Sequence, residues 1–140
     1  MPALTALAAF VLTRHLIGRA WPALLAGYLF GFSPFMVGQQ WAGHIFMTAA
    51  FLIPIAIYLA VLRFEHRLGA AAFMALLTPT LVCQFLLGME LFVSLIMFGA
   101  IGLILAWLFW SEFRRQLQSV ALWSAVSIFA AAVVLSPFLY

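Results

Sequence analysis

The chain has 140 residues, of which 69% are hydrophobic and only 6% are charged, and its formal net charge is +3. A soluble domain carries about 25% charged residues, so this composition excludes an ordinary soluble domain and indicates an integral membrane protein. The positive charge does not indicate a nucleic-acid partner, because the chain has no lysine and no run or stripe of basic side chains.

The first half of the chain contains three apolar stretches. A helix needs roughly 20 apolar residues to cross a hydrocarbon core of about 30 Å. The first stretch, residues 3–17, is short and is interrupted by Arg14 and His15, so we interpret it as the end of a helix. The second runs over about 20–37 and the third over about 45–62, and each predicts one spanning helix.

The second half contains one apolar stretch, residues 68–110, that is too long for a single crossing at about 1.5 Å per residue. Its one polar interruption is residues 84–90, which include Gly88, and we place a turn there. A last stretch covers residues 117–135. The sequence therefore predicts an all-α fold, a polytopic transmembrane helix bundle of about six membrane-spanning helices with short loops.

No connection between the stretches is long enough for a soluble domain, so residues 1–140 are predicted to form a single transmembrane domain. Because the first helix is short and the last one stops abruptly, we expect a fragment of a longer membrane protein. Helices in lipid associate where small residues allow close approach. We expect Gly27 with Gly31, and Gly99 with Gly102, to be packing seams within the chain.

The arginines predict the orientation in the membrane. Every second gap between apolar stretches carries a pair of them, Arg14 with Arg19, Arg63 with Arg67, and Arg114 with Arg115. Short loops rich in arginine stay on the cytoplasmic side. The chain is thus predicted to be a multi-pass protein of the cell inner (plasma) membrane, with its arginine-bearing loops cytoplasmic. Residues 39–44, 88–90 and 136–140 then face outward.

Polar side chains on the predicted outer side are the candidates for chemistry. Glu90 is the one acidic residue outside the predicted cytoplasmic loops, and Gln84 lies six residues before it. An ionisable group at membrane depth indicates function, although at the interface Glu90 could simply polarise a tight turn. His44 begins the third stretch, where free helix amides favour anions, and Gln39 and Gln40 lie just before it. We predict that these five residues bind substrate; the alternative for His44 is a histidine at headgroup level.

The sequence contains no complete catalytic or metal-binding set. There is no aspartate, no Cys-x-x-Cys and no glycine-rich phosphate loop, and the single cysteine, Cys83, is expected to pack among apolar neighbours. A metal site would need at least one ligand beyond His44 and Glu90. A divalent metal is therefore compatible with the chain, but no metal ligand is assigned and the cofactor stays unknown.

Several short motifs resemble a family of bacterial polytopic membrane proteins, the GT-C-type glycosyltransferases that use lipid-linked sugars. The motifs are Gly31-Phe32-Ser33-Pro34-Phe35 with Gly43-His44 and Ile53-Pro54, then residues 84–90, which are similar to a Q-x-L-x-S-x-E segment with Gly88 in place of serine, and finally Pro137-Phe138-Leu139-Tyr140. The matches follow in order over nearly the whole chain.

The resemblance implies part of an integral-membrane glycosyltransferase that uses a polyprenyl-phosphate-linked sugar donor on the extracytoplasmic face. Gln39, Gln40, His44 and Glu90 would then bind phosphate or sugar. The acidic residue that serves this class lies on an outer loop ahead of the matched region, and the chain contains no such loop, so no catalytic residue is assigned. Two alternatives stay open, a membrane transporter or flippase subunit and a non-catalytic membrane assembly protein. The sugar, the acceptor and the oligomeric state are not identified.

Overall fold

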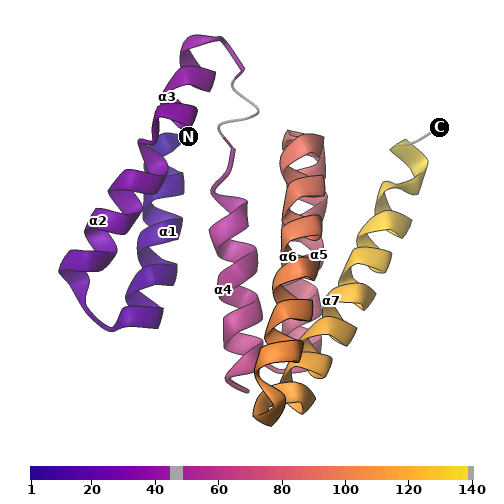
Figure 1. The fold of residues 1–140 in the computed structure, drawn as a ribbon. Helices are drawn as coiled ribbons and strands as arrows, with labels where there is room; N and C mark the ends of the chain where they lie inside the picture. Colours follow the sequence, from indigo (N-terminus) through magenta and orange to yellow (C-terminus); the bar gives the residue numbers. More distant parts are fainter. Residues whose placement is uncertain (45–48, 139–140) are drawn as a thin grey trace. The chain divides into compact units, whose positions relative to one another are not determined.

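The computed structural model describes residues 1–44 and 49–138, and this part of the chain is helical, with no strands (Figure 1). The α-helices are α1 (Pro2–Ile17), α2 (Ala20–Gly31), α3 (Pro34–Trp41), α4 (Leu52–Phe64), α5 (Ala70–Leu87), α6 (Met89–Phe109) and α7 (Arg114–Leu135). Two 3₁₀ turns, η2 (Ser111–Phe113) and η3 (Ser136–Phe138), flank α7. The predicted all-α fold is confirmed.

Four helical segments in the described residues are long and apolar enough to cross a membrane. They are Ala20–Trp41, which joins α2 and α3, then Ala70–Leu87, Met89–Phe109 and Ser111–Leu135. Two shorter apolar helices, Pro2–Ile17 and Leu52–Phe64, bring the set to six. The predicted polytopic bundle of about six apolar helices with short loops is confirmed, and the chain is a membrane protein.

The helix boundaries follow the predicted stretches with two differences. The second stretch breaks at Phe32–Ser33, because Ser33 caps α3 by accepting a hydrogen bond from Met36 N at 3.4 Å and Pro34 opens that helix. The third helix begins at Leu52 rather than near residue 45, and residues 45–48 lie outside the described residues. The turn at Gly88 is where the sequence places it: Gly88 N donates to Gln84 O at 2.9 Å.

The chain divides into two compact units, Met1–Tyr58 and Leu59–Tyr140. The organisation as a single domain, and as a fragment of a longer protein, stays a prediction.

In the first unit, α1 packs tightly against α2 through glycines. A Cβ atom added to Gly27 would lie 2.6 Å from Ala6 O, and one added to Gly31 would lie 2.6 Å from Ala6 N and 2.7 Å from Pro2 O. No larger residue fits these distances unless the backbone moves, so the predicted seam at Gly27 and Gly31 lies within the chain, as expected.

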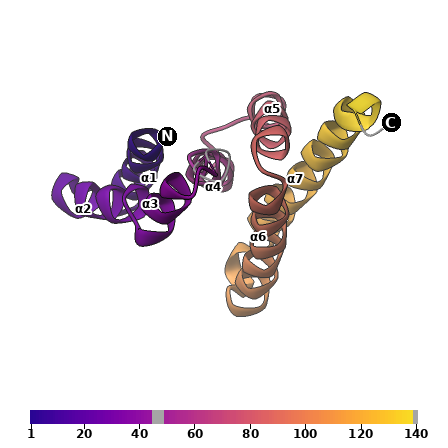
Figure 2. The ribbon, with the colours of Figure 1, turned by 90° about the horizontal axis from the view of Figure 1, so that it is seen from above.

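In the second unit, α5 packs chiefly against α7, and α6 contacts both (Figure 2). The buried residues of α5 recur every three or four positions, as one helix face requires: Phe73, Leu77, Leu81 and Gln84. The buried residues of α7 are Leu117, Val120, Ser127, Ala131 and Leu135.

The middle helix of the second unit, α6, has no buried residue. A Cβ atom added to Gly99 or Gly102 would meet nothing within 4 Å among the described residues. The expected second seam is therefore wrong within the second unit. The first seam depends on a close approach of two helices at glycine. In the second unit, no neighbouring helix lies that close to Gly99 or Gly102.

Candidate functional site

The predicted site residues of the first unit lie at the end of α3. Gly43 adopts a left-handed backbone (φ 78°), which turns the chain back so that His44 N donates to Gln39 O at 3.0 Å. The His44 ring also lies against the same residue, with Nδ1 2.9 Å from Gln39 Oε1. An amide oxygen only accepts hydrogen bonds, so Nδ1 carries the hydrogen of this contact.

This contact gives His44 a defined chemical capacity. With Nδ1 donating to Gln39, the Nε2 atom of the neutral ring keeps a lone pair that can accept a hydrogen bond or a proton. His44 and Gln40 are exposed and Gln39 is half-buried, so the pair is accessible from outside the unit. The structure thus brings together two of the five predicted residues, with Gln40 next to them in the chain.

In the second unit, Gln84 and Glu90 lie on either side of the α5–α6 turn and have opposite environments. Gln84 is fully buried, at 0% exposure, and neither its Oε1 nor its Nε2 has a hydrogen-bond partner among the described residues. Glu90 is exposed in the first turn of α6, where a carboxylate interacts favourably with the helix dipole. The two groups belong to different units, and the predicted substrate binding by all five residues stays a prediction.

A polar contact that the sequence did not reveal lies at the opposite end of the second unit. Arg63 donates through Nη1 to Leu68 O at 3.0 Å and through Nη2 to Ser119 Oγ at 2.8 Å. Its Nε is buried with no partner among the described residues. Sequence reasoning used Arg63 only to predict orientation. The one available signal was Ser119, a polar residue at the start of an apolar stretch, but it is 56 residues away in sequence.

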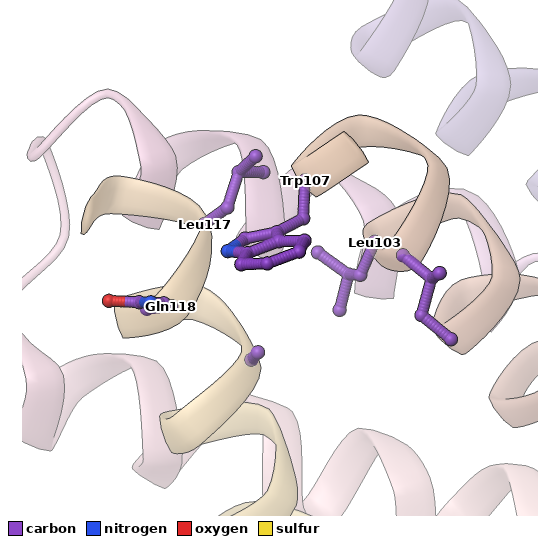
Figure 3. Close-up of a pocket in the computed structure, with 6 residues that line it drawn as sticks. Leu103, Trp107, Leu117 and Gln118 are labelled. Atoms are coloured by element: carbon purple, nitrogen blue, oxygen red, sulfur yellow. The ribbon is translucent and has the colours of Figure 1, made fainter. Parts of the chain in front are cut away.

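An apolar groove lies between α6 and α7 in the second unit, with a volume of about 190 Å³. Its lining residues are Leu103, Ile104, Trp107, Leu117, Gln118 and Ala121. Figure 3 shows the Trp107 ring between Leu103 and Leu117, with the Gln118 amide directed away from it. Arg114 lies over this ring, its guanidinium carbon 4.5 Å from the ring centroid, and donates through Nε to Trp107 O at 3.3 Å.

The part of the chain that the structure describes contains no group of three or more His, Cys, Asp or Glu side chains that could hold a metal ion. Cys83, which was expected to pack among apolar neighbours, is exposed on α5. The correction has a simple cause: Cys83 precedes the buried Gln84 by one position and therefore lies on a different face of the helix.

Comparison with known proteins finds no matching family model and no matching solved structure. Three curated proteins named apolipoprotein N-acyltransferase are similar to part of the chain. The one from Rhizobium rhizogenes is 40% identical over 60 residues, which is 43% of this chain and 10% of the relative. Those from Rhizobium etli and Rhizobium leguminosarum are 46% and 44% identical over 46 residues, 30% of this chain and 9% of each relative. The chain thus spans about a tenth of the length of these relatives.

These similarities contradict the expected family. The prediction of a GT-C-type glycosyltransferase with a polyprenyl-phosphate sugar donor is wrong, since the relatives are named as acyltransferases. The transporter, flippase and assembly alternatives do not match them either. The structure shows why the motifs misled. Ser33-Pro34 caps the start of a helix, Gly88 and Glu90 form another helix start, and Ser136-Pro137 follows a helix end. Such helix-end residues recur in unrelated membrane proteins.

Proposed function

We propose that this chain supplies membrane-embedded helices of an enzyme that transfers an acyl group to a nitrogen atom of an apolipoprotein. The observation that carries the proposal is the 40% identity over 60 residues with a protein of that name. The apolar character of the helices agrees with it, because four described segments are long and apolar enough to lie in the bilayer that holds acyl chains.

Within this proposal, the predicted substrate-binding residues are polar contacts for the acyl donor or the acceptor. His44 supports such a role best, because Gln39 orients its ring and leaves Nε2 with a lone pair. The Gln84 amide has no partner among the described residues, but it is fully buried, so it can contact a substrate only if the helices around it move apart. Gln40 and Glu90 are exposed beside these positions in the chain. None of the five is assigned a catalytic step.

The proposal includes an orientation with the arginine-bearing loops on the cytoplasmic side of the inner membrane. In the second unit, the Arg63–Ser119 hydrogen bond and the Phe64–Phe113 ring contact (5.7 Å between centroids) hold two of the arginine pairs at one end. Glu90 lies at the α5–α6 turn, at the other end of the same helices (Figure 1). This arrangement supports arginine loops inside and Glu90 outside.

The test of the function is the acylation of lipoproteins in the cells that make this chain. Depleting the chain should lower the fraction of apolipoprotein that carries an amide-linked acyl group, as measured by mass spectrometry, and re-expressing it should restore that fraction. An acylated fraction that stays unchanged on depletion would overturn the proposal.

Two glycine variants make the rescue specific. Gly31→Ala adds a Cβ only 2.6 Å from Ala6 N, so it should disrupt the α1–α2 seam and fail to restore acylation. Gly69→Ala is the matched control, because its Cβ would meet nothing within 4 Å and its backbone is extended (φ −65°, ψ 156°). It should restore acylation as the unchanged chain does.

A further inference from the structure

The groove between α6 and α7 combines an apolar lining with positive charge at one end. Its lining side chains are apolar apart from Gln118. Arg114 lies on the Trp107 wall, and Arg115 follows it in the exposed first turn of α7. An apolar groove with the Arg114 guanidinium on one wall complements a molecule with an apolar chain and an anionic head.

Neither Arg114 at the groove nor Arg115, the next residue in the chain, is neutralised within the described residues. The ion pair at this end of the unit joins Arg67 to Glu65, with 3.3 Å between Nε and Oε2, whereas neither Arg114 nor Arg115 forms one. No acidic residue lies in the first turn of α7. Even with the exposed Glu112, residues 112–115 carry a net charge of +1, from two arginines and one glutamate.

The size of the groove restricts what can enter it. Its volume of about 190 Å³ is below the roughly 300–1,000 Å³ of pockets that enclose drug-sized ligands. It has room for part of a slender hydrocarbon chain but not for a bulky polar headgroup. Trp107, which lines the groove, and Trp110, three residues later, are exposed, as aromatic residues at a membrane–water interface are.

We propose that this groove binds an anionic phospholipid, with one acyl chain along Leu103, Trp107 and Ala121 and its phosphate on Arg114 and Arg115. This bound lipid is separate from the acyl transfer proposed above, because the groove contains none of the five proposed substrate contacts. The groove lies at the end of the second unit that bears the arginines.

The test is native mass spectrometry of the purified chain, carried out with equal amounts of phosphatidylglycerol and phosphatidylcholine that have the same acyl chains. The unchanged chain should retain more of the anionic lipid. Arg114→Gln with Arg115→Gln should lower the ratio of retained anionic to zwitterionic lipid about fivefold for each arginine. Arg67→Gln is the control for a single charge, because it removes one arginine at the same end that is paired with Glu65 and does not line the groove, and it should leave the ratio near that of the unchanged chain.

A second variant tests the apolar part of the groove. Ala121→Phe places a ring in the groove and should lower the retention of both lipids without changing their ratio. The proposal is overturned if Ala121→Phe retains both lipids fully, or if the double arginine variant keeps the ratio. An equal loss in Arg67→Gln would also overturn it, because the preference would then be a general effect of surface charge.

Two further outcomes are distinguishable in the same experiment. If a second copy of the chain occupied the groove, a dimer would appear and Ala121→Phe would remove it without changing lipid retention, which would overturn the proposal. If circular dichroism shows that Ala121→Phe loses helix, the double arginine variant still decides, because both of its altered side chains are exposed.

Discussion

Gln84 is the residue whose environment differs most from what its chemistry requires. Its side-chain amide is fully buried on the α5 face that includes Leu77 and Leu81, with no partner among the described residues. Leaving a buried polar group unsatisfied costs about 1–3 kcal/mol, and replacing it with an apolar group of similar shape removes that cost. Gln84→Leu should therefore raise the free energy of unfolding by about 1–3 kcal/mol.

The measurement is unfolding in mixed micelles, followed by the loss of helical signal. Cys83→Ala, at the exposed neighbouring position, is the control and should change little. A loss of stability in Gln84→Leu would show that the amide is bonded in the folded protein, and our description of it as unsatisfied would then be wrong.

The same residue shows how far a sequence can locate a site. That Gln84 is exceptional is readable from its position in an apolar stretch. The sequence does not show that Gln84 is buried and Glu90 exposed. This difference depends on which face of α5 packs against α7 and on the new helix that starts after Gly88. Similarly, Gln39 and His44 are close in sequence, but their ring-to-amide contact requires the left-handed backbone at Gly43.

Between elements, the hydrogen bond from Arg63 to Ser119 joins the end of α4 to the start of α7. Hydrogen bonds to charged groups contribute about 1.5–3 kcal/mol, more than neutral ones. We expect a double-mutant cycle with Arg63→Met and Ser119→Ala to give a coupling free energy of about 1–2 kcal/mol. Purely additive effects would contradict a direct bond, and Arg67→Met with Ser119→Ala, which lacks the contact, should be additive.

The order and number of the apolar helices follow from the sequence because span length, glycine and proline are local signals. The α5–α6 turn at Gly88 and the end of α7 before Ser136 are of this kind. The break between α2 and α3 also has a local signal, a serine cap followed by proline. The prediction of one span over about 20–37 rested on length and did not use this signal. Contacts between distant helices, such as Arg63 with Ser119, leave no such local signal.

At the scale of the whole molecule, orientation is the prediction that every outward-facing site requires. In a Cys83→Ser background, a cysteine at Glu90 should react with a membrane-impermeant maleimide on intact cells, because Glu90 lies at the end of the second unit opposite the arginines. A cysteine at Glu112, exposed at the arginine end, should react only after the cells are opened. The reverse labelling pattern would show that the chain has the opposite orientation in the membrane.

Similarity to known proteins also extends over long stretches of the chain, and the short motifs did not reveal it. The resemblance to glycosyltransferases rested on residues that start and end helices, which many membrane proteins share. The relatives were found instead through identity distributed over 46 to 60 residues. Identity distributed over tens of residues is stronger evidence of relatedness than a few residues at helix ends.

The glycine seam between α1 and α2 has a consequence for how the chain is made. The contacts of Gly27 and Gly31 with Ala6 and Pro2 are complete once the chain has left the ribosome as far as Gly31. This hairpin can therefore form in the membrane during synthesis, since its contacts are local in sequence. The pairing of α5 with α7 has to wait until α6, which lies between them in the chain, has been inserted. The order of the helices thus predicts two stages of membrane assembly: the α1–α2 hairpin forms first, and the α5–α7 pair forms later.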